Sequence, residues 1–356
     1  MIRINDVSVN KYAIKNVVDA LSQDEISGNY GCYIDKFEKA IAEYCGTKYA
    51  SVTNSGTSAI HLSVLSEYIK GEIIIPALTM AATAFAVLYS GCKPVLVDVD
   101  KDTWNIDINQ IEDKITDDTI AIIPVHLYGN PCDMNSILRI ANKHSLDVIE
   151  DCAESFGATY NDKKVGSIGN VGCHSFYASK MLSIGEGGAI TTDSKDEYDF
   201  VNNIKNMAFG NKYKYLHKDI GYNYRMPNIQ AAIGLAQLTD LDSTIYKKRE
   251  IHKDYMDEFD WINGISLQQK TDNSNPVWWM NGCTVDNPNK VRKNLTKNNI
   301  ETSDVFVPLN KQSFIKDKSS YPNAEYISKH GFLLPSGYTL NENQVRYIGK
   351  YIKAVL

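Results

Sequence analysis

Two stretches decide the fold of this chain: Val148–Tyr160, which reads VIEDCAESFGATY, and Ser175–Ile190, which reads SFYASKMLSIGEGGAI. In each of them a short apolar run typical of a buried strand leads into polar residues. The first run ends at Asp151, and the second is followed by Lys180. An acid and a lysine in this setting suit pyridoxal 5′-phosphate (PLP), because the acid pairs with the pyridine nitrogen and the lysine forms a Schiff base.

Similar apolar runs alternate with helical patterns between about residues 47 and 235. We expect strands at 72–76, 94–98, 120–127, 146–151, 172–177 and 188–192, and helices at 58–68, 83–90, 108–115, 134–144 and 196–207. Strands that are apolar on both faces and separated by helices predict an α/β fold with a mostly parallel sheet. Ligands of such sheets bind beyond the carboxyl ends of the strands, where Asp151 and Lys180 fall.

The length of 356 residues exceeds what one hydrophobic core usually supports, so the chain should hold two domains. A long helical pattern that begins at Pro227 leads out of the sheet region. We therefore expect a large PLP-binding α/β domain over residues 31–235 and a smaller α+β domain over residues 236–356. The N-terminal segment, residues 1–30, is expected to pack on the smaller domain.

Composition excludes several classes of protein. Lys and Arg total 37 against 43 Asp and Glu, with no concentrated basic run, so nucleic acid is not an expected partner. The chain has neither a bilayer-spanning apolar run nor a signal-peptide core, so we expect no membrane insertion and a cytoplasmic location. The seven cysteines form no C-x-x-C pair, which favours free thiols over disulfides, and we expect no metal.

A phosphate cradle is predicted where Ser55, Gly56 and Thr57 follow a strand-like run and open a helix. Free N–H groups at a helix start, with hydroxyls beside them and a glycine that allows close approach, bind phosphate. The same residue types are ordinary helix caps, so this motif is weak when taken alone. Ser175 is a further candidate donor to the phosphate.

For each reactive residue, a purely structural role is the alternative interpretation. Asp151 would keep the pyridine nitrogen protonated, but a carboxylate at a strand end also caps turns. Lys180 would hold the cofactor and then move the substrate proton, whereas a lone lysine is normally a surface charge. Glu154, one turn beyond Asp151, is placed to touch the ring hydroxyl. Asn223, in the polar segment GYNYRMP, fits phosphate recognition or a structural role at the domain junction.

Read together, the motifs resemble those of the DegT/DnrJ/EryC1/StrS sugar aminotransferases, which have the fold-type I, aspartate aminotransferase-like fold of PLP-dependent transferases. The resemblance rests on NSGTSAIHL, VIEDCAESFGA, SFYASK, GEGGAI and GYNYRMPNIQAAIGLAQL. It implies that Lys180 is the Schiff-base lysine, Asp151 the pyridinium partner and Glu154 the neighbour of the ring hydroxyl. Gly56, Thr57 and Ser175 would bind the phosphate. Asn223 looks like the residue that a second subunit lends, which implies a homodimer with shared sites.

Within the family, the motifs are most similar to those of the perosamine synthases. That branch aminates C-4 of a nucleotide-linked 4-keto-6-deoxyhexose for surface polysaccharides, usually with glutamate as donor and 2-oxoglutarate as by-product. The cofactor would alternate between PLP and pyridoxamine 5′-phosphate. Dehydration at C-3, for which relatives carry a histidine in place of the lysine, is disfavoured because Lys180 is present; the nearby His174 is out of register.

Some features leave the acceptor open. Met80 stands where relatives usually have an aromatic ring stacked on the cofactor, although a thioether can also pack on a ring. The C-terminal domain, which helps to form the acceptor pocket, is short, and Trp278 and Trp279 stand there in an otherwise ordinary region. The alternatives are amination at C-3, amination of a smaller phosphorylated ketone, and a non-catalytic binding or regulatory protein with this fold.

Overall fold

The centre of the computed structural model, which describes residues 1–7, 9–67, 70–210 and 213–356, is a seven-stranded sheet with the order β1-β9-β8-β5-β4-β2-β3. Its strands are β1 (Tyr49–Thr53), β2 (Glu72–Pro76), β3 (Lys93–Val97), β4 (Thr119–Ile122), β5 (Asp147–Asp151), β8 (Val171–Ser175) and β9 (Gly188–Thr192). The strands from β8 to β3 pair in parallel, whereas β9 runs antiparallel to β8 and β1. The predicted fold class is confirmed.

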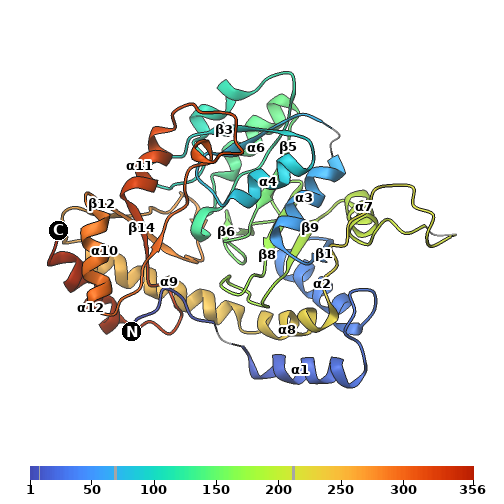
Figure 1. Ribbon diagram of the computed structural model, residues 1–356, viewed down its shortest axis with the longest axis horizontal. Helices are drawn as coiled ribbons and strands as arrows, with labels where there is room; N and C mark the ends of the chain where they lie inside the picture. Colours follow the sequence, from blue (N-terminus) through green and yellow to red (C-terminus); the bar gives the residue numbers. More distant parts are fainter. Residues whose placement is uncertain (8, 68–69, 211–212) are drawn as a thin grey trace.

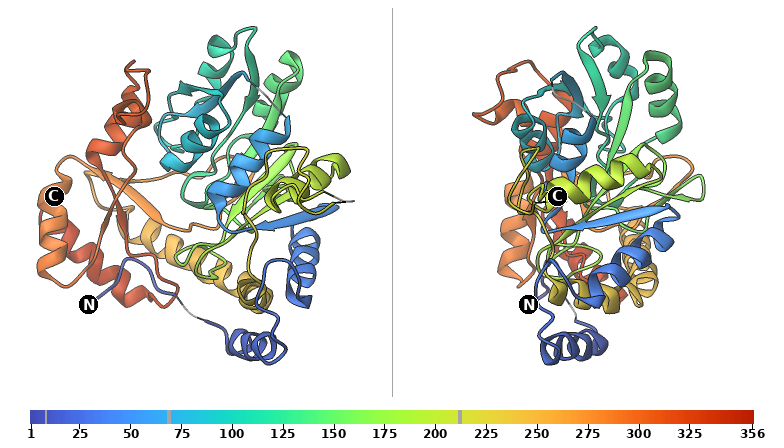
Figure 2. Two further views of the ribbon diagram at one scale, coloured as in Figure 1. Left: turned by 45° about the vertical axis from the view of Figure 1, so that its right-hand side comes forward. Right: turned by 90° about the vertical axis from the view of Figure 1, so that its right-hand side faces the viewer.

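Helices surround this sheet (Figures 1 and 2). They are α2 (Cys32–Cys45), α3 (Gly56–Glu67), α4 (Ala81–Tyr89), α5 (Ile108–Ile111), α6 (Met134–His144), α7 (Lys195–Lys205) and α8 (Asn228–Leu238). Strand β2 shows why both faces need cover, because Ile73, Ile74 and Ile75 are each 0% exposed. Ile74 packs in one core with Met134 of α6, and its two neighbours belong to the larger core. Alternating side chains of one strand thus enter two cores.

Most element boundaries lie within one or two residues of the prediction, as is usual for helix and strand ends. The strand expected at 120–127 is an exception, since β4 ends at Ile122. Pro124 has no N–H to donate, and the chain then turns at Tyr128, whose φ is 55°. The helix expected at 108–115 is also shorter: a 3₁₀ turn follows α5. The expected end of another helix, Tyr68, lies outside the described residues.

The long helical pattern after Pro227 forms two helices, α8 and α9 (Leu241–Phe259). Helix α9 leads into a four-stranded antiparallel sheet with the order β10-β12-β14-β13. This smaller region comprises β10 (Ile265–Leu267), β12 (Asn281–Val285), α10 (Pro288–Lys297), β13 (Ser303–Asp304), α11 (Pro322–His330), β14 (Gly331–Leu334) and α12 (Glu342–Lys353). Ile245 of α9 packs in the larger core and Ile251 in a separate core, so the core changes within α9 and not at residue 236.

A short third sheet, β11-β6-β7, brings the two regions together. Strands β6 (Thr159–Tyr160) and β7 (Lys163–Lys164) precede β8, whereas β11 (Ser274–Asn275) belongs to the smaller region. None of the helices in the described ranges combines the length and the apolar composition needed to cross a bilayer.

The N-terminal segment divides between the two regions, which differs from the expectation that residues 1–30 pack on the smaller domain. Ile2 bridges to Ile300, and Ile4 accepts the N–H of Ser336. Helix α1 (Lys11–Ser22) lies instead along α8 (Figure 1). Ala13 and Ala20 of α1 are fully buried. Their small side chains let the helix pack closely on its neighbour.

The buried side chain of Asn228, in α8, links this helix to the start of α2 and to the segment at Glu25. Its Oδ1 accepts the N–H groups of Tyr33 and Ile34 at the start of α2, and its Nδ2 donates to Glu25 O at 2.7 Å. Because Asn228→Ala leaves one buried and two partly buried backbone groups without this partner, we expect the free energy of unfolding to fall by about 2–4 kcal/mol. Urea unfolding measures this change, and the exposed Asn109→Ala is the control. An unchanged midpoint for Asn228→Ala would contradict the linking role.

Candidate active site

A cavity of about 370 Å³ lies at the carboxyl ends of the central strands. All of the predicted site residues except Asn223 line it, namely Ser55, Gly56, Thr57, Met80, Asp151, Glu154, Ser175 and Lys180. Asp151 ends β5 and Ser175 ends β8, so the sheet itself brings them to one edge. Phe306 and Trp279, from the smaller region, also line it.

Asp151 lies at the bottom of the pocket with only 4% of its surface exposed. Its Oδ2 accepts the Thr83 hydroxyl at 2.8 Å, and its Oδ1 accepts the Ala153 N–H at 3.1 Å. Burial raises the pKa of Asp151, although these hydrogen bonds and the Lys180 charge act in the opposite direction. A buried carboxylate of this kind is stabilised by a cationic ligand, and a protonated pyridine nitrogen is one.

Lys180 stands at the side of the same pocket, with 13% of its side chain exposed. Its Nζ is 3.4 Å from Glu154 Oε1 and 3.7 Å from the centre of the Trp279 ring. Glu154 is held in turn by the Tyr128 N–H, which donates to Oε2 at 2.8 Å. Burial raises the pKa of Glu154, and the Lys180 charge offsets part of that effect. The turn at Tyr128 therefore orients the carboxylate that faces the lysine.

The start of α3 forms the opposite end of the pocket. The Ser58 N–H donates to Ser55 Oγ at 3.1 Å. The N–H groups of Gly56 and Thr57 lie in the first turn of the helix, where the helix itself offers no carbonyl to accept them. A Cβ added at Gly56 would lie 2.7 Å from Ser175 Cβ, so only glycine allows this close approach. Backbone donors and nearby hydroxyls of this kind fit a phosphate group. The residues present thus suit both ends of PLP.

Met80 precedes α4 at the mouth of the pocket and is 52% exposed. Asn223 is also exposed but does not line the pocket of its own chain. Its backbone oxygen accepts a hydrogen bond from the Asn54 side-chain amide at 3.4 Å, which places it beside the segment that begins α3.

Trp279 and Phe306 both line the pocket but were not assigned to the site from the sequence, and Trp279 makes the contacts with the lysine turn. Its ring covers Lys180, and its indole N–H donates to Ser179 O at 2.6 Å. No local pattern indicated this contact, because the tryptophan and the lysine lie on different domains. The adjacent pair of tryptophans, Trp278 and Trp279, was the only available signal.

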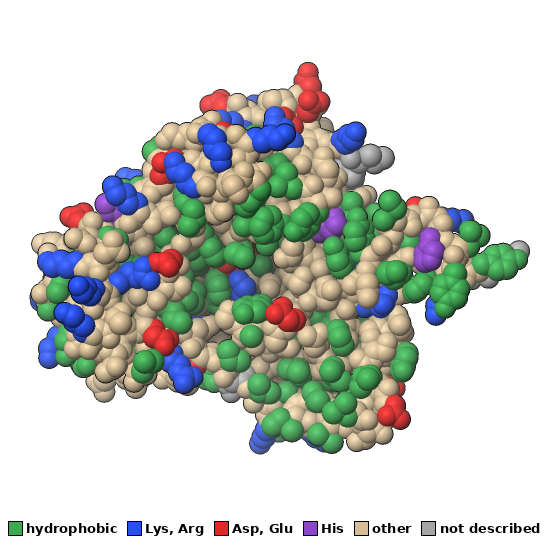
Figure 3. Space-filling model, in the orientation of Figure 1, with side chains coloured by type: hydrophobic (Ala, Val, Ile, Leu, Met, Phe, Trp, Pro, Cys, Tyr) green, Lys and Arg blue, Asp and Glu red, His purple; other side chains and the backbone are tan. Residues whose placement is uncertain are grey.

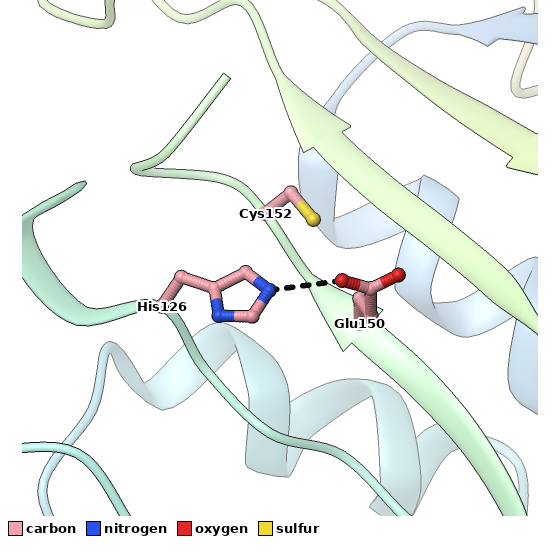
Figure 4. Close-up of side chains that lie close together, drawn as sticks. All are labelled: His126, Glu150 and Cys152. Atoms are coloured by element: carbon pink, nitrogen blue, oxygen red, sulfur yellow. Dashed lines mark hydrogen bonds and ion pairs between the residues drawn. The ribbon is translucent and has the colours of Figure 1, made fainter. Parts of the chain in front are cut away.

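Within the described ranges, one group of side chains could hold a metal ion, namely His126, Glu150 and Cys152 (Figure 4). His126 Nε2 is 3.1 Å from Glu150, and its Nδ1 accepts the Cys132 N–H at 3.0 Å. The second oxygen of Glu150 accepts the Gly169 N–H. Burial alone would raise the pKa of Glu150, but the hydrogen bonds from His126 and from the backbone at Gly169 lower it. The histidine and the carboxylate are thus engaged in hydrogen bonds within the protein.

Comparison with known proteins agrees with this geometry. The chain matches the model of the DegT/DnrJ/EryC1/StrS aminotransferase family over residues 8–353, and it belongs to that family. It is accordingly a PLP-dependent enzyme of the transaminase type, which confirms the predicted class and cofactor.

Three relatives illustrate the similarity. A GDP-perosamine synthase of Escherichia coli O157:H7 is 40% identical over 324 residues, which cover 89% of this chain and 88% of that protein. A dTDP-3-amino-3,6-dideoxy-alpha-D-galactopyranose transaminase of Aneurinibacillus thermoaerophilus is 36% identical, with 96% of this chain and 95% of that protein covered. The solved PLP-form of a candidate sugar aminotransferase from Streptococcus pneumoniae has a TM-score of 0.93 at 26% identity, covering 99% of this chain and 98% of that one.

The raised pKa of Asp151 leads to a prediction about stability. A carboxylate whose pKa is raised on folding contributes stability at low pH that is lost as the pH rises through the raised pKa. At pH 7 the cofactor-free Asp151→Asn variant should therefore unfold at the same or a higher temperature than the unmodified protein, and this advantage should shrink as the pH falls. PLP should raise the unfolding temperature of the variant by less than it raises that of the unmodified protein.

Thermal unfolding with and without PLP measures both effects, and the exposed Asp117→Asn is the control. An equal PLP-induced shift in the Asp151→Asn variant would contradict the pairing of Asp151 with a cationic ring.

Proposed function

We propose that this enzyme transfers the amino group of glutamate to the C-4 keto group of a nucleotide-linked 4-keto-6-deoxyhexose, giving an amino sugar of the perosamine or viosamine type. The observation that carries the proposal is the pocket itself, in which a buried acid, a lysine and an open helix start converge. Similarity to a GDP-perosamine synthase over most of both chains supports the choice of acceptor.

Each end of the pocket has a role in holding the cofactor. Asp151 would pair with the pyridine nitrogen, Glu154 would contact the ring hydroxyl, and Lys180 would form the covalent bond. The phosphate would bind Gly56 and Thr57 at the start of α3, with Ser55 and Ser175 beside them. Met80 would pack on one face of the ring. Bound PLP supplies a protonated ring that accepts the electron pair left when the substrate carbon loses its proton.

Lys180 is the proton carrier in this proposal. In each half-reaction its Nζ would move one proton between the substrate carbon and the cofactor carbon that carries the transferred nitrogen: away from the α-carbon of glutamate in the first, and onto C-4 of the sugar in the second. One water is consumed when 2-oxoglutarate is released, and one is formed from the keto oxygen of the sugar. Glu154, 3.4 Å away, would stabilise the ammonium form while the proton is on Nζ. The apolar rings of Trp279 and Phe306 limit the access of water.

A homodimer would complete each site. Asn223 is exposed and lies outside the pocket of its own chain, so it is available to the phosphate site of a second copy. Hydrophobic side chains also gather along the lower edge of the face in Figure 3, where α1 lies in Figure 1. Ile14, Val18 and Leu21 of α1 are each more than half exposed. Exposed apolar surface of this kind marks an interface.

A second candidate is amination at C-3 of a keto sugar nucleotide. It is favoured by the 36% identity to a transaminase whose name specifies a 3-amino sugar. The pocket residues serve either position, because the site of amination depends on how the sugar is oriented.

Incubation with glutamate and GDP-, UDP- and dTDP-linked 3-keto and 4-keto 6-deoxy sugars tests the two candidates. Mass analysis should show an amine formed from a 4-keto sugar, and NMR should place the amine at C-4. Lys180→Ala should form no product while keeping its unfolding temperature. A product from the 3-keto sugars alone would favour the second candidate, and no amination of any sugar would contradict both.

Mixed dimers test the shared site. When subunits with Lys180→Ala are combined with subunits with Asn223→Ala, one site of each mixed dimer has both residues intact. We expect purified mixed dimers to be clearly more active than either parent. Activity no higher than that of the parents would contradict the contribution of Asn223 to the partner's site.

A further inference from the structure

Trp279 contacts the segment of Lys180 in two independent ways. Its indole N–H donates to the backbone oxygen of Ser179, at 2.6 Å, and its ring centre lies 3.7 Å from Lys180 Nζ. A cation over the face of an indole ring at this distance is attracted by the ring electrons. Trp279 lies between β11 and β12 of the smaller region, whereas Lys180 lies between β8 and β9. One side chain therefore joins the smaller region to both the backbone and the amine of the lysine turn.

A closed set of hydrogen bonds fixes this arrangement. Asn5 Nδ2 also donates to Ser179 O, at 2.8 Å, so the residue before Lys180 is held by two donors. The buried Lys248 of α9 donates to Trp279 O at 3.0 Å and to Asn5 Oδ1 at 3.4 Å. The two donors to Ser179 are thus connected to each other through Lys248. The turn before the lysine is held by the N-terminal segment, α9 and the smaller region together.

The neighbour of Trp279 also restricts its orientation. Trp278 has a φ of 50°, and its ring stacks on His252 with 3.6 Å between the ring centres. Trp278 is thereby directed to α9, and the next side chain, Trp279, lines the pocket. Trp279 is 9% exposed, so its side chain is largely enclosed by protein.

We propose that Trp279 is a positioning residue for Lys180. Its ring face holds the amine at the pocket whenever the amine is not bonded to the cofactor, and its indole N–H fixes the turn that carries the lysine. A free lysine side chain otherwise spreads over many rotamers, which would slow its return to the same reacting position. This inference rests on the proposed role of Lys180.

The test compares Trp279→Leu, which removes the ring and the N–H, with Trp279→Phe, which keeps an aromatic face. The exposed Trp261→Leu is the control, because Trp261 is 83% exposed. The measurement is the rate at which cofactor-free protein captures PLP, followed by the visible absorbance of the lysine-bound cofactor, together with thermal unfolding. We expect Trp279→Leu to slow capture about tenfold, a change of about 1.4 kcal/mol, and Trp279→Phe to recover part of the rate.

A purely structural role for Trp279 predicts a lower unfolding temperature with normal capture, and that result would overturn the inference. If Trp279→Leu does not fold, Trp279→Met keeps much of the volume without the ring and replaces it in the comparison. Lys180→Ala distinguishes the proposed role of Lys180 from the positioning role of Trp279. Visible capture retained by Lys180→Ala would refute the proposed role of Lys180, whereas capture lost there but unchanged in the Trp279 variants refutes only the positioning role.

Discussion

The carboxylate of Asp151 lies almost fully buried at the end of β5, held by the Thr83 hydroxyl and the Ala153 N–H. Burial of a charged group is costly unless a cation or hydrogen bonds compensate for it. The surrounding elements supply hydrogen bonds and leave an open pocket on the other side. The geometry therefore favours a ligand with a positive ring nitrogen, which agrees with membership of a PLP-dependent family.

The remaining groups take their places around this acid because parallel strands end at one edge of the sheet. Ser175 ends β8, and Gly56 opens the helix that follows β1. The smaller region adds Trp279 and Phe306, so the pocket forms only when both regions are packed together. Helix α9 connects them, because its residues enter both the larger core and the separate core.

The parts of the site that could be predicted are those encoded by short local patterns. Asp151, Ser175 and Gly56 lie at strand ends or helix starts, and the structure brings all three to one cavity. Trp279 could not be predicted, since its contact with Lys180 depends on how two domains pack. The same reason applies to α1, whose position on α8 is a matter of tertiary packing.

The end of β4 shows a second reason why part of the fold could not be predicted from the sequence. The apolar pattern continues to Leu127, but Pro124 lacks a backbone donor and Tyr128 adopts a positive φ. That turn directs the Tyr128 N–H to Glu154, so a departure from the predicted strand is part of the pocket. A hydrophobic pattern alone does not reveal such a turn, because backbone geometry and a distant acceptor determine it.

The most direct test of the central claim is the location of the covalent bond to PLP. The protein loaded with PLP is reduced with borohydride, digested and examined by mass spectrometry. The account predicts that the added mass of the reduced cofactor lies on the peptide that contains Lys180. Cofactor mass on another lysine, with the peptide of Lys180 unmodified, would contradict it.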